Sequence, residues 1–122
     1  MDNLIHSYTR AEAIEDGFLV DVSDTAKEAG FLYPVALTAT VYRDYVEVPE
    51  GVEGQDESGR LWDILFLCRH KIKRSNGGTT CFFYLLVKND NNKDAERVRL
   101  KAVCGANDDA SPCITVMMPD ED

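Results

Sequence analysis

Cysteine and histidine are the residue types in this chain that could act as nucleophiles or bind a metal ion. The chain has four cysteines, at 68, 81, 104 and 113, and two histidines, at 6 and 70. Structural zinc sites use closely spaced pairs of ligands, and the one close pair here is Cys68 with His70. Residues two apart on a helix point in different directions, so these side chains should not meet. A pairing of Cys81 with His70 stays open, although buried, reduced thiols are the commoner outcome.

Pairs of neighbouring acids are the other groups that could bind a cation or transfer protons. They occur at 15–16, 56–57 and 108–109. Solvated loop acids are far commoner than catalytic ones, and the sequence lacks the alternating acidic pattern of a calcium-binding loop. The glycines at 77–78 follow a predicted helix, whereas a phosphate-binding loop precedes one. The sequence therefore predicts no catalytic residue, no metal and no cofactor.

The charges fall into three blocks along the chain. Residues 1–59 carry a net charge of −10, residues 60–104 carry +6 and residues 105–122 carry −5, which gives −9 in total. The middle block supplies a candidate basic surface, formed by Arg69, Lys71, Lys73, Arg74, Arg97, Arg99 and Lys101. Nucleic-acid-binding domains are usually basic overall, and the two acidic blocks would repel a duplex. We therefore expect the acidic blocks to neutralise this surface, and we do not expect direct binding to nucleic acid.

Length and composition predict a single domain over residues 1–122. With 44% hydrophobic and 29% charged residues, the chain can bury a core of its own. The longest strongly apolar stretch, 64–68, is too short for a membrane span, and the sequence opens on no secretion signal. We expect a cytoplasmic protein with reduced thiols and no membrane association. Within the domain, residues 47–59 should form an acidic loop and residues 119–122 an acidic tail.

Capping signals predict two short helices around one strand in the first quarter of the chain. Thr9 and Glu12 have the spacing of a capping box, which favours a helix at 7–17. A short apolar run then predicts a strand at 18–22. Ser23 can cap a second helix that ends near residue 29, where a glycine follows.

Two further helices are expected before the chain turns to β-structure. Pro34 suits the first turn of a third helix, and apolar residues follow it at a spacing of four: Leu37, Val41 and Tyr45. A fourth, longer helix runs from about Arg60 to Arg74, with an apolar face and a basic last turn. Trp62 in this helix should be largely buried.

Three strands complete the predicted fold, at 80–88, 96–104 and 113–118. Side chains alternate along a strand, so each has one apolar row toward the helices. In this arrangement Cys104 points inward and Cys113 outward, which excludes a disulfide between them. We predict an α+β fold with short N-terminal helices and one early strand, a longer amphipathic helix, and an antiparallel three-stranded meander.

The first strand of the meander is apolar on both sides. Phe82, Tyr84 and Leu86 alternate with an inner row that is already apolar, and compact domains rarely leave such a patch exposed. We expect the N-terminal segment to cover the patch through Ile14 and Phe31, which predicts a monomer. The alternative is a homodimer that buries Phe82, Tyr84 and Leu86.

Several segments resemble those of one protein family. They are 8–17 (YTRAEAIEDG), 20–23 (VDVS), 34–38 (PVALT), 58–63 (SGRLWD) and 114–122 (ITVMMPDED). Together they resemble an uncharacterised family of small proteins encoded on bacterial conjugative plasmids and integrating elements. The resemblance covers essentially the whole chain. It implies a bacterial, cytoplasmic, mobile-element setting, and it brings no assigned activity with it.

These segments contain the most site-like side chains of the sequence: Arg10, Asp16, Asp21, Arg60, Trp62 and Asp63. Helix capping and core packing explain most of them. We predict a non-catalytic accessory protein that binds another protein, and its sharpest version is an acidic inhibitor that imitates DNA phosphates. The alternative is a small enzyme with a site near Arg10, Asp21, Arg60, Trp62 and Asp63. Convergence of these side chains on one pocket would favour the enzyme, and dispersal would favour the interaction protein.

Overall fold

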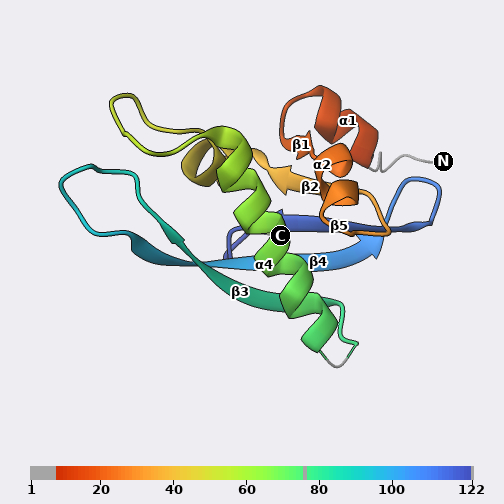
Figure 1. Ribbon diagram of the computed structural model, residues 1–122. Helices are drawn as coiled ribbons and strands as arrows, with labels where there is room; N and C mark the ends of the chain where they lie inside the picture. Colours follow the sequence, from red (N-terminus) through yellow and green to blue (C-terminus); the bar gives the residue numbers. More distant parts are fainter. Residues whose placement is uncertain (1–7, 76, 122) are drawn as a thin grey trace.

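The computed structural model describes residues 8–75 and 77–121, and it confirms the α+β class (Figure 1). In chain order the elements are α1 (Arg10–Glu15), β1 (Leu19–Asp21), α2 (Ser23–Glu28), β2 (Val35–Thr38), α3 (Ala39–Val41), the π-helix η1 (Tyr42–Val46), α4 (Glu57–Arg74), β3 (Thr80–Val87), β4 (Glu96–Ala106) and β5 (Pro112–Met117).

The five strands form one mixed sheet in the order β1-β2-β5-β4-β3. Strands β3, β4 and β5 follow one another as an antiparallel meander, but the predicted three-stranded sheet was too small, because two more strands continue it. On its other side β5 pairs in parallel with β2, and β2 pairs antiparallel with β1. The meander is therefore part of a larger sheet, because β2 supplies the hydrogen-bond partners that β5 would otherwise lack.

The segment after Pro34 is a strand, and the prediction of a helix there was wrong. Val35, Ala36 and Leu37 pair with β5 inside the sheet and are at most 1% exposed. A short apolar run that is buried on both faces has no period, so sequence alone does not separate strand from helix. The chain becomes helical only from Ala39, where the hydroxyl of Thr38 accepts a hydrogen bond from the N–H of Val41 at 3.3 Å.

The structure confirms the capping box that was predicted at the start of α1. The hydroxyl of Thr9 accepts from the N–H of Glu12, and the carboxylate of Glu12 accepts from the N–H of Thr9, each at 3.0 Å. This reciprocal pair satisfies two backbone donors that a helix start leaves open. The helix is shorter than the predicted span of 7–17, and Ser7 lies outside the described residues.

Helix α4 lies across one face of the sheet and forms the core with it (Figure 1). The side chain of Asp56 caps it by accepting from the N–H of Gly59 at 2.6 Å, so the helix begins at Glu57, within the segment predicted as an acidic loop. Ile64, Leu65 and Cys68 are fully buried against the sheet. Burial of an aliphatic side chain of this size contributes about 1.5–3 kcal/mol.

Trp62 is 41% exposed, so the prediction that it is largely buried was wrong. The buried positions of α4 are Arg60, Ile64, Leu65 and Cys68. Because each residue turns an α-helix by about 100°, Trp62 lies roughly 200° around the helix from both Arg60 and Ile64. The apolar residues of α4 therefore extend around more of the helix than the sheet covers.

The second face of the sheet is covered at its β2–β5 side. Ala36, Cys113 and Met117 are buried there, although they do not belong to the core under α4. Arg10 of α1 reaches this face, where it donates to the hydroxyl of Thr115 at 2.6 Å. Cys113 thus lies on the face opposite Cys104, as predicted, but it is buried and does not meet solvent.

The N-terminal segment was expected to cover Phe82, Tyr84 and Leu86 through Ile14 and Phe31, and this was wrong. Phe31 belongs to the core on the α4 side of the sheet. Tyr84 stays 43% exposed and Leu86 stays 70% exposed. The part of the second face formed by β3 is therefore left open by the described residues.

Candidate functional site

Strand β3 is the last in the sheet, and no described strand lies along its outer edge (Figure 1). One hydrogen bond fixes which residues face that edge: the N–H of Cys104 donates to the carbonyl of Thr79 at 2.7 Å. In an antiparallel pair, directly bonded residue pairs alternate with pairs that are not bonded. Odd-numbered residues of β3 therefore bond β4, and the even-numbered residues of 80–86 direct their N–H and C=O groups to the open edge.

The same even-numbered residues point their side chains to the sheet face that α4 leaves uncovered. Two arginines of β4 lie over the rings of Phe82 and Tyr84. The guanidinium carbon of Arg97 is 3.9 Å from the ring centre of Tyr84, and that of Arg99 is 3.9 Å from the ring centre of Phe82. Contacts of this kind are worth about 0.5–1 kcal/mol at exposed sites. We call Phe82, Tyr84, Leu86, Arg97 and Arg99 the β3 edge surface.

Strand β3 itself lacks the devices that usually protect an edge strand. Natural edges are very short, carry charges or proline, or contain bulges. Strand β3 has eight residues, none charged and none proline, and its pairing with β4 runs from Thr80 to Val87 without a bulge. Strand β1, at the other side of the sheet, has three residues. Of the two edges, β3 is the one that can accept another extended chain.

The predicted basic surface is split between the two faces of the sheet. Arg97, Arg99 and Lys101 lie on the face opposite α4, whereas the other four cations belong to α4. Lys101 donates to the backbone carbonyl of Glu121 at 2.5 Å. Between described residues the structure records one ion pair, Arg43–Asp44 at 2.9 Å. The expected neutralisation by the acidic blocks therefore does not take the form of ion pairs in this part of the chain.

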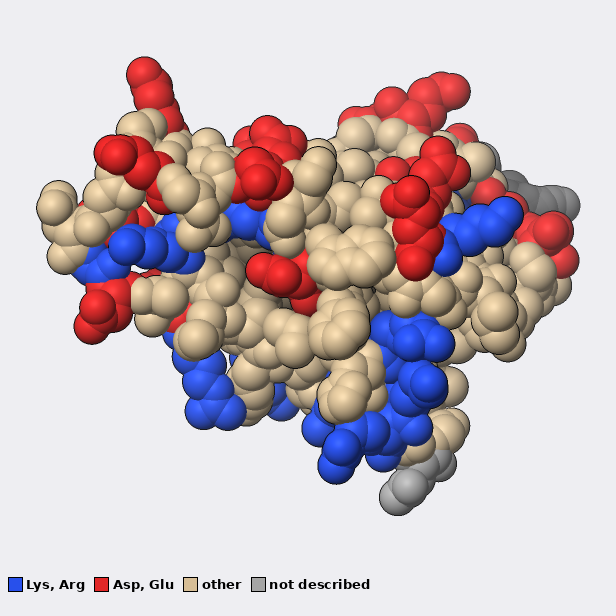
Figure 2. All heavy atoms as spheres, in the orientation of Figure 1, with Lys and Arg blue, Asp and Glu red and all other residues tan. Residues whose placement is uncertain are grey.

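Charges of opposite sign gather at different borders of the molecule. In the view of Figure 2, Asp and Glu line the upper border, over the N-terminal helices and the loop before α4. Lys and Arg gather around the C-terminal end of α4, at the lower side. In this view acids thus predominate along the upper border and bases around the C-terminal end of α4, while Lys and Arg lie beside acids at the left and right.

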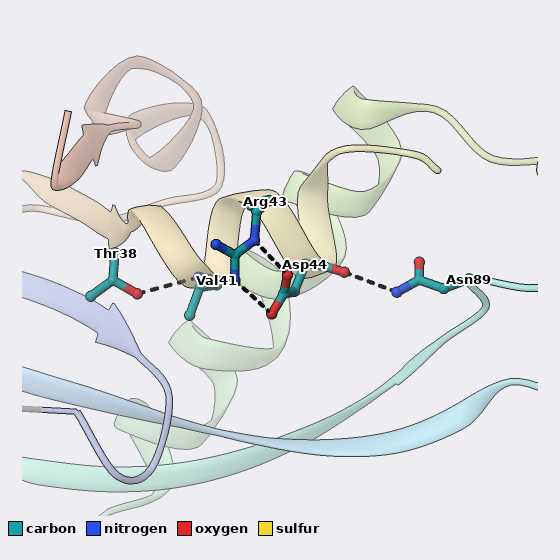
Figure 3. A network of polar contacts seen from close by, with 5 residues as sticks. All are labelled: Thr38, Val41, Arg43, Asp44 and Asn89. Atoms are coloured by element: carbon teal, nitrogen blue, oxygen red, sulfur yellow. Dashed lines mark hydrogen bonds and ion pairs between the residues drawn. The ribbon is translucent and has the colours of Figure 1, made fainter. Parts of the chain in front are cut away.

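Arg60, one of the site-like residues, links α4 to two other segments through hydrogen bonds. It is 6% exposed, its Nε donates to the carbonyl of Tyr45 at 3.0 Å, and its Nη2 donates to Oδ1 of Asn89 at 2.5 Å. Asn89 in turn donates through Nδ2 to the carbonyl of Asp44 at 2.9 Å (Figure 3). Burial lowers the pKa of the Arg60 guanidinium. These bonds connect α4, η1 and the β3–β4 loop.

Asp16 and Asp21 make local contacts in the N-terminal part. Asp16 accepts a hydrogen bond from the hydroxyl of Tyr8, and this bond raises the pKa of Tyr8 to about 12. Asp21 accepts from the N–H of Ser23 at 3.1 Å and from its hydroxyl at 2.5 Å, at the start of α2. Both carboxylates therefore stabilise the ends of short helices.

The site-like residues do not share one site. The N–H of Arg10 donates to Asp108, which follows β4, whereas Arg60 bonds Asn89, which precedes β4. Strand β4 has 11 residues, which span roughly 36 Å at about 3.3 Å per residue. Arg10 and Arg60 are thus near opposite ends of the sheet. Asp63 lies beside Arg60, at a small cavity of about 20 Å³.

The two cysteines nearest His70 in the sequence are poor nucleophiles. Cys68 is fully buried, and burial raises the pKa of its thiol to about 12. Burial also raises the pKa of Cys81, and Lys71 offsets part of this effect. Thiols with a raised pKa react slowly because the thiolate is the nucleophile. Among residues 8–75 and 77–121, no three His, Cys, Asp or Glu side chains gather where they could hold a metal ion.

These features define a small α+β protein with a mixed five-stranded sheet and one unprotected edge. A family of unknown function, DUF6573, matches residues 1–122, and the chain belongs to this family. No curated protein and no solved structure matches the chain. In the described part of the chain, no helix has both the length and the apolar character needed to cross a bilayer.

Proposed function

We propose that the protein is a non-catalytic interaction protein that binds another protein at the β3 edge surface. The observation that carries this proposal is the open edge of an uncharged strand of eight residues. A strand added there would pair with the backbone groups of the even-numbered residues of 80–86. Each such hydrogen bond contributes about 0.5–1.5 kcal/mol net. The dispersal of Arg10 and Arg60 supports an interaction protein over the alternative small enzyme.

The side chains of the β3 edge surface define the partner segment. It is extended, because only an extended chain can pair along β3. Its side chains on the outer face would pack beside Tyr84 and Leu86, which favours apolar residues. Arg97 and Arg99 have no ion-pair partner among the described residues, so acids in the segment would complement them. Such complementarity raises the association rate and fixes the register of the added strand.

The resemblance to proteins of conjugative plasmids and integrating elements supports a setting in the bacterial cytoplasm, as an accessory to a mobile genetic element. The acids along the upper border in Figure 2 favour one second candidate. In that version they imitate DNA phosphates and occupy a nucleic-acid-binding protein. The two candidates use different borders of the molecule, so substitutions separate them.

Proline substitution at the edge provides the test. The N–H of Leu86 faces the open edge, so Leu86→Pro removes a donor for an added strand without cutting the β3–β4 pairing. The tagged protein and its variants would be used to capture partners from a bacterial host. We expect Leu86→Pro and Arg97→Glu to lose the captured protein, and the matched control Arg43→Glu, at an exposed arginine of η1, to retain it.

Circular dichroism and thermal melting must first show that each variant folds like the parent. Retention of the partner by folded Leu86→Pro would refute the edge proposal. The acidic inhibitor would be favoured if glutamine at residues 47, 50 and 53 abolished capture of the partner while Leu86→Pro still captured it. Light scattering that finds a dimer sensitive to Leu86→Pro would show instead that the edge pairs two copies of this chain.

A further inference from the structure

A cavity of about 340 Å³ opens on the α4 side of the sheet, away from the β3 edge surface. Its floor is formed by three neighbouring strands, through Cys81 of β3, Ala102 and Cys104 of β4, and Ile114 of β5. The walls are the C-terminal half of α4 and the loop between α2 and β2. The volume is at the lower end of the range of small-molecule pockets, about 300–1,000 Å³.

The lining of this cavity is mostly apolar, and its rim exposes large apolar side chains. Phe31 and Ile72 form part of the wall. Leu32, at the rim, is 89% exposed, and Tyr33 beside it is 44% exposed. Apolar side chains grouped around a hollow mark a binding surface more often than scattered ones do. The apolar part of a ligand would find its contacts here.

Two cations stand at the mouth of the cavity. Arg69 and Lys73 are one helical turn apart on α4, and both line the cavity, whereas no Asp or Glu is among the lining residues that the structure describes. The Nε of Arg69 donates to the carbonyl of Gly30 at 3.0 Å, which fixes the guanidinium at the rim. A Cβ at residue 30 would lie 2.7 Å from that Nε, so a side chain there would displace the guanidinium from this position.

The fixed guanidinium leaves its two terminal nitrogens available. Between described residues the structure records no hydrogen bond from Nη1 or Nη2 of Arg69, and none from Lys73. A guanidinium held by one bond presents its remaining donors in a fixed direction, which suits the two oxygens of a carboxylate. Lys73 adds a second positive charge within the same helical turn.

We propose that this cavity binds a small amphipathic carboxylate. The apolar body of the ligand fills the space above Cys81, Ala102 and Ile114, and its carboxylate binds Arg69 and Lys73. A neutral or cationic ligand of the same shape would fill the cavity but would have no partner for its head. This inference is independent of the proposed function, because the cavity and the β3 edge surface lie on opposite faces of the sheet.

The cavity contains its own reporter. Cys104 lines it and is exposed, whereas Cys81, which also lines it, is half-buried, and Cys68 and Cys113 are buried. A thiol reagent should therefore react first with Cys104, and a ligand in the cavity should slow that reaction. Cys104→Ser assigns the fast phase. The probes are decanoate, 1-decanol and decyltrimethylammonium, which share a chain length and differ in the charge of the head. The two ions are used below their micellar concentrations and 1-decanol below its solubility limit.

We expect decanoate to slow the labelling of Cys104 and to bind about tenfold more tightly than 1-decanol, as one charge-assisted contact predicts. Lys73→Gln should reduce that preference, and Arg69 should keep the rest of it. Arg74→Gln is the matched control, since Arg74 is exposed on the same end of α4 but does not line the cavity. Leu32→Ser tests the apolar part: it should weaken decanoate and 1-decanol equally.

Three results would overturn this proposal. The first is equal binding of the three probes, which would show unspecific association of detergent-like molecules. The second is an equal loss of decanoate binding in Arg74→Gln and Lys73→Gln, which would show a general charge effect. The third is saturating decanoate that leaves the labelling of Cys104 unchanged. Leu86→Pro should leave decanoate binding intact, so failure of the edge proposal does not affect this one.

Discussion

Replacement of Arg60 by methionine tests how the buried guanidinium contributes to stability. Methionine keeps an unbranched, apolar stem in the same space and removes both hydrogen bonds, to Tyr45 and to Asn89. It also removes Nη1, a buried nitrogen that has no hydrogen-bond partner among the described residues. The variant thus loses two favourable contacts and one unfavourable group at once.

The expected magnitude follows from these terms. Hydrogen bonds to a charged group contribute about 1.5–3 kcal/mol each, and a buried donor without a partner costs about 1–3 kcal/mol. In the variant, Oδ1 of Asn89 can accept a hydrogen bond from water, because Asn89 is exposed. Most of the lost stability therefore comes from the carbonyl of Tyr45, which loses its donor. The balance predicts that Arg60→Met lowers the free energy of unfolding by about 2 kcal/mol, or roughly 6–10 °C in Tm for a domain of this size.

Urea unfolding and thermal melting followed by circular dichroism would measure this loss. Arg43→Met is the matched control: its side chain is 66% exposed, and exposed ion pairs are worth about 0–1 kcal/mol. An Arg60→Met variant as stable as the parent would refute the reasoning. It would mean that desolvation of the charge costs as much as its bonds contribute, as happens for some buried ion pairs.

Burial and exposure set three more outcomes. Trp62→Ala should lower the free energy of unfolding by clearly less than the about 3–5 kcal/mol typical of a buried aromatic, because Trp62 is exposed. Ile64→Ala should lower it by about 2–5 kcal/mol, measured by urea unfolding. Equal losses in the two variants would contradict the orientation of α4. Tyr84→Glu should stay folded and monomeric in light scattering, because Tyr84 is 43% exposed; unfolding would show that the face is covered. The pKa of Cys68 is raised from 9.0 to about 12 by burial, so the unfolded chain loses this proton first as pH rises. Stability should therefore fall above pH 9 by up to about 1.4 kcal/mol per pH unit, and Cys68→Ala should reduce that slope.

Local sequence was sufficient for the elements whose signals lie within a few residues. The capping box of Thr9 and Glu12 predicted α1, and the apolar spacing between Ile64 and Cys68 predicted α4. Alternation predicted the three strands of the meander and placed Cys104 and Cys113 on opposite faces. These features rest on contacts within one helical turn or one strand, so they can be recognised before the fold is known.

The prediction failed where distant segments decide the structure. Val35–Thr38 is a strand because β5, almost 80 residues later, pairs with it. Trp62 is exposed because the apolar residues of α4 extend around more of the helix than the sheet covers. The apolar character of Phe82, Tyr84 and Leu86 was visible in the sequence, but the openness of the β3 edge was not.

The α+β class, the capping of α1, the amphipathic α4 and the faces of the three late strands can be read from short stretches of sequence. The strand order, the open β3 edge, the separation of Arg10 from Arg60 and the cavity beside Arg69 and Lys73 become visible once the chain is folded. Helix caps and strand alternation depend on neighbours in the chain. An edge or a cavity depends on which distant surfaces are left uncovered when β2 joins β5 and α4 packs on the sheet.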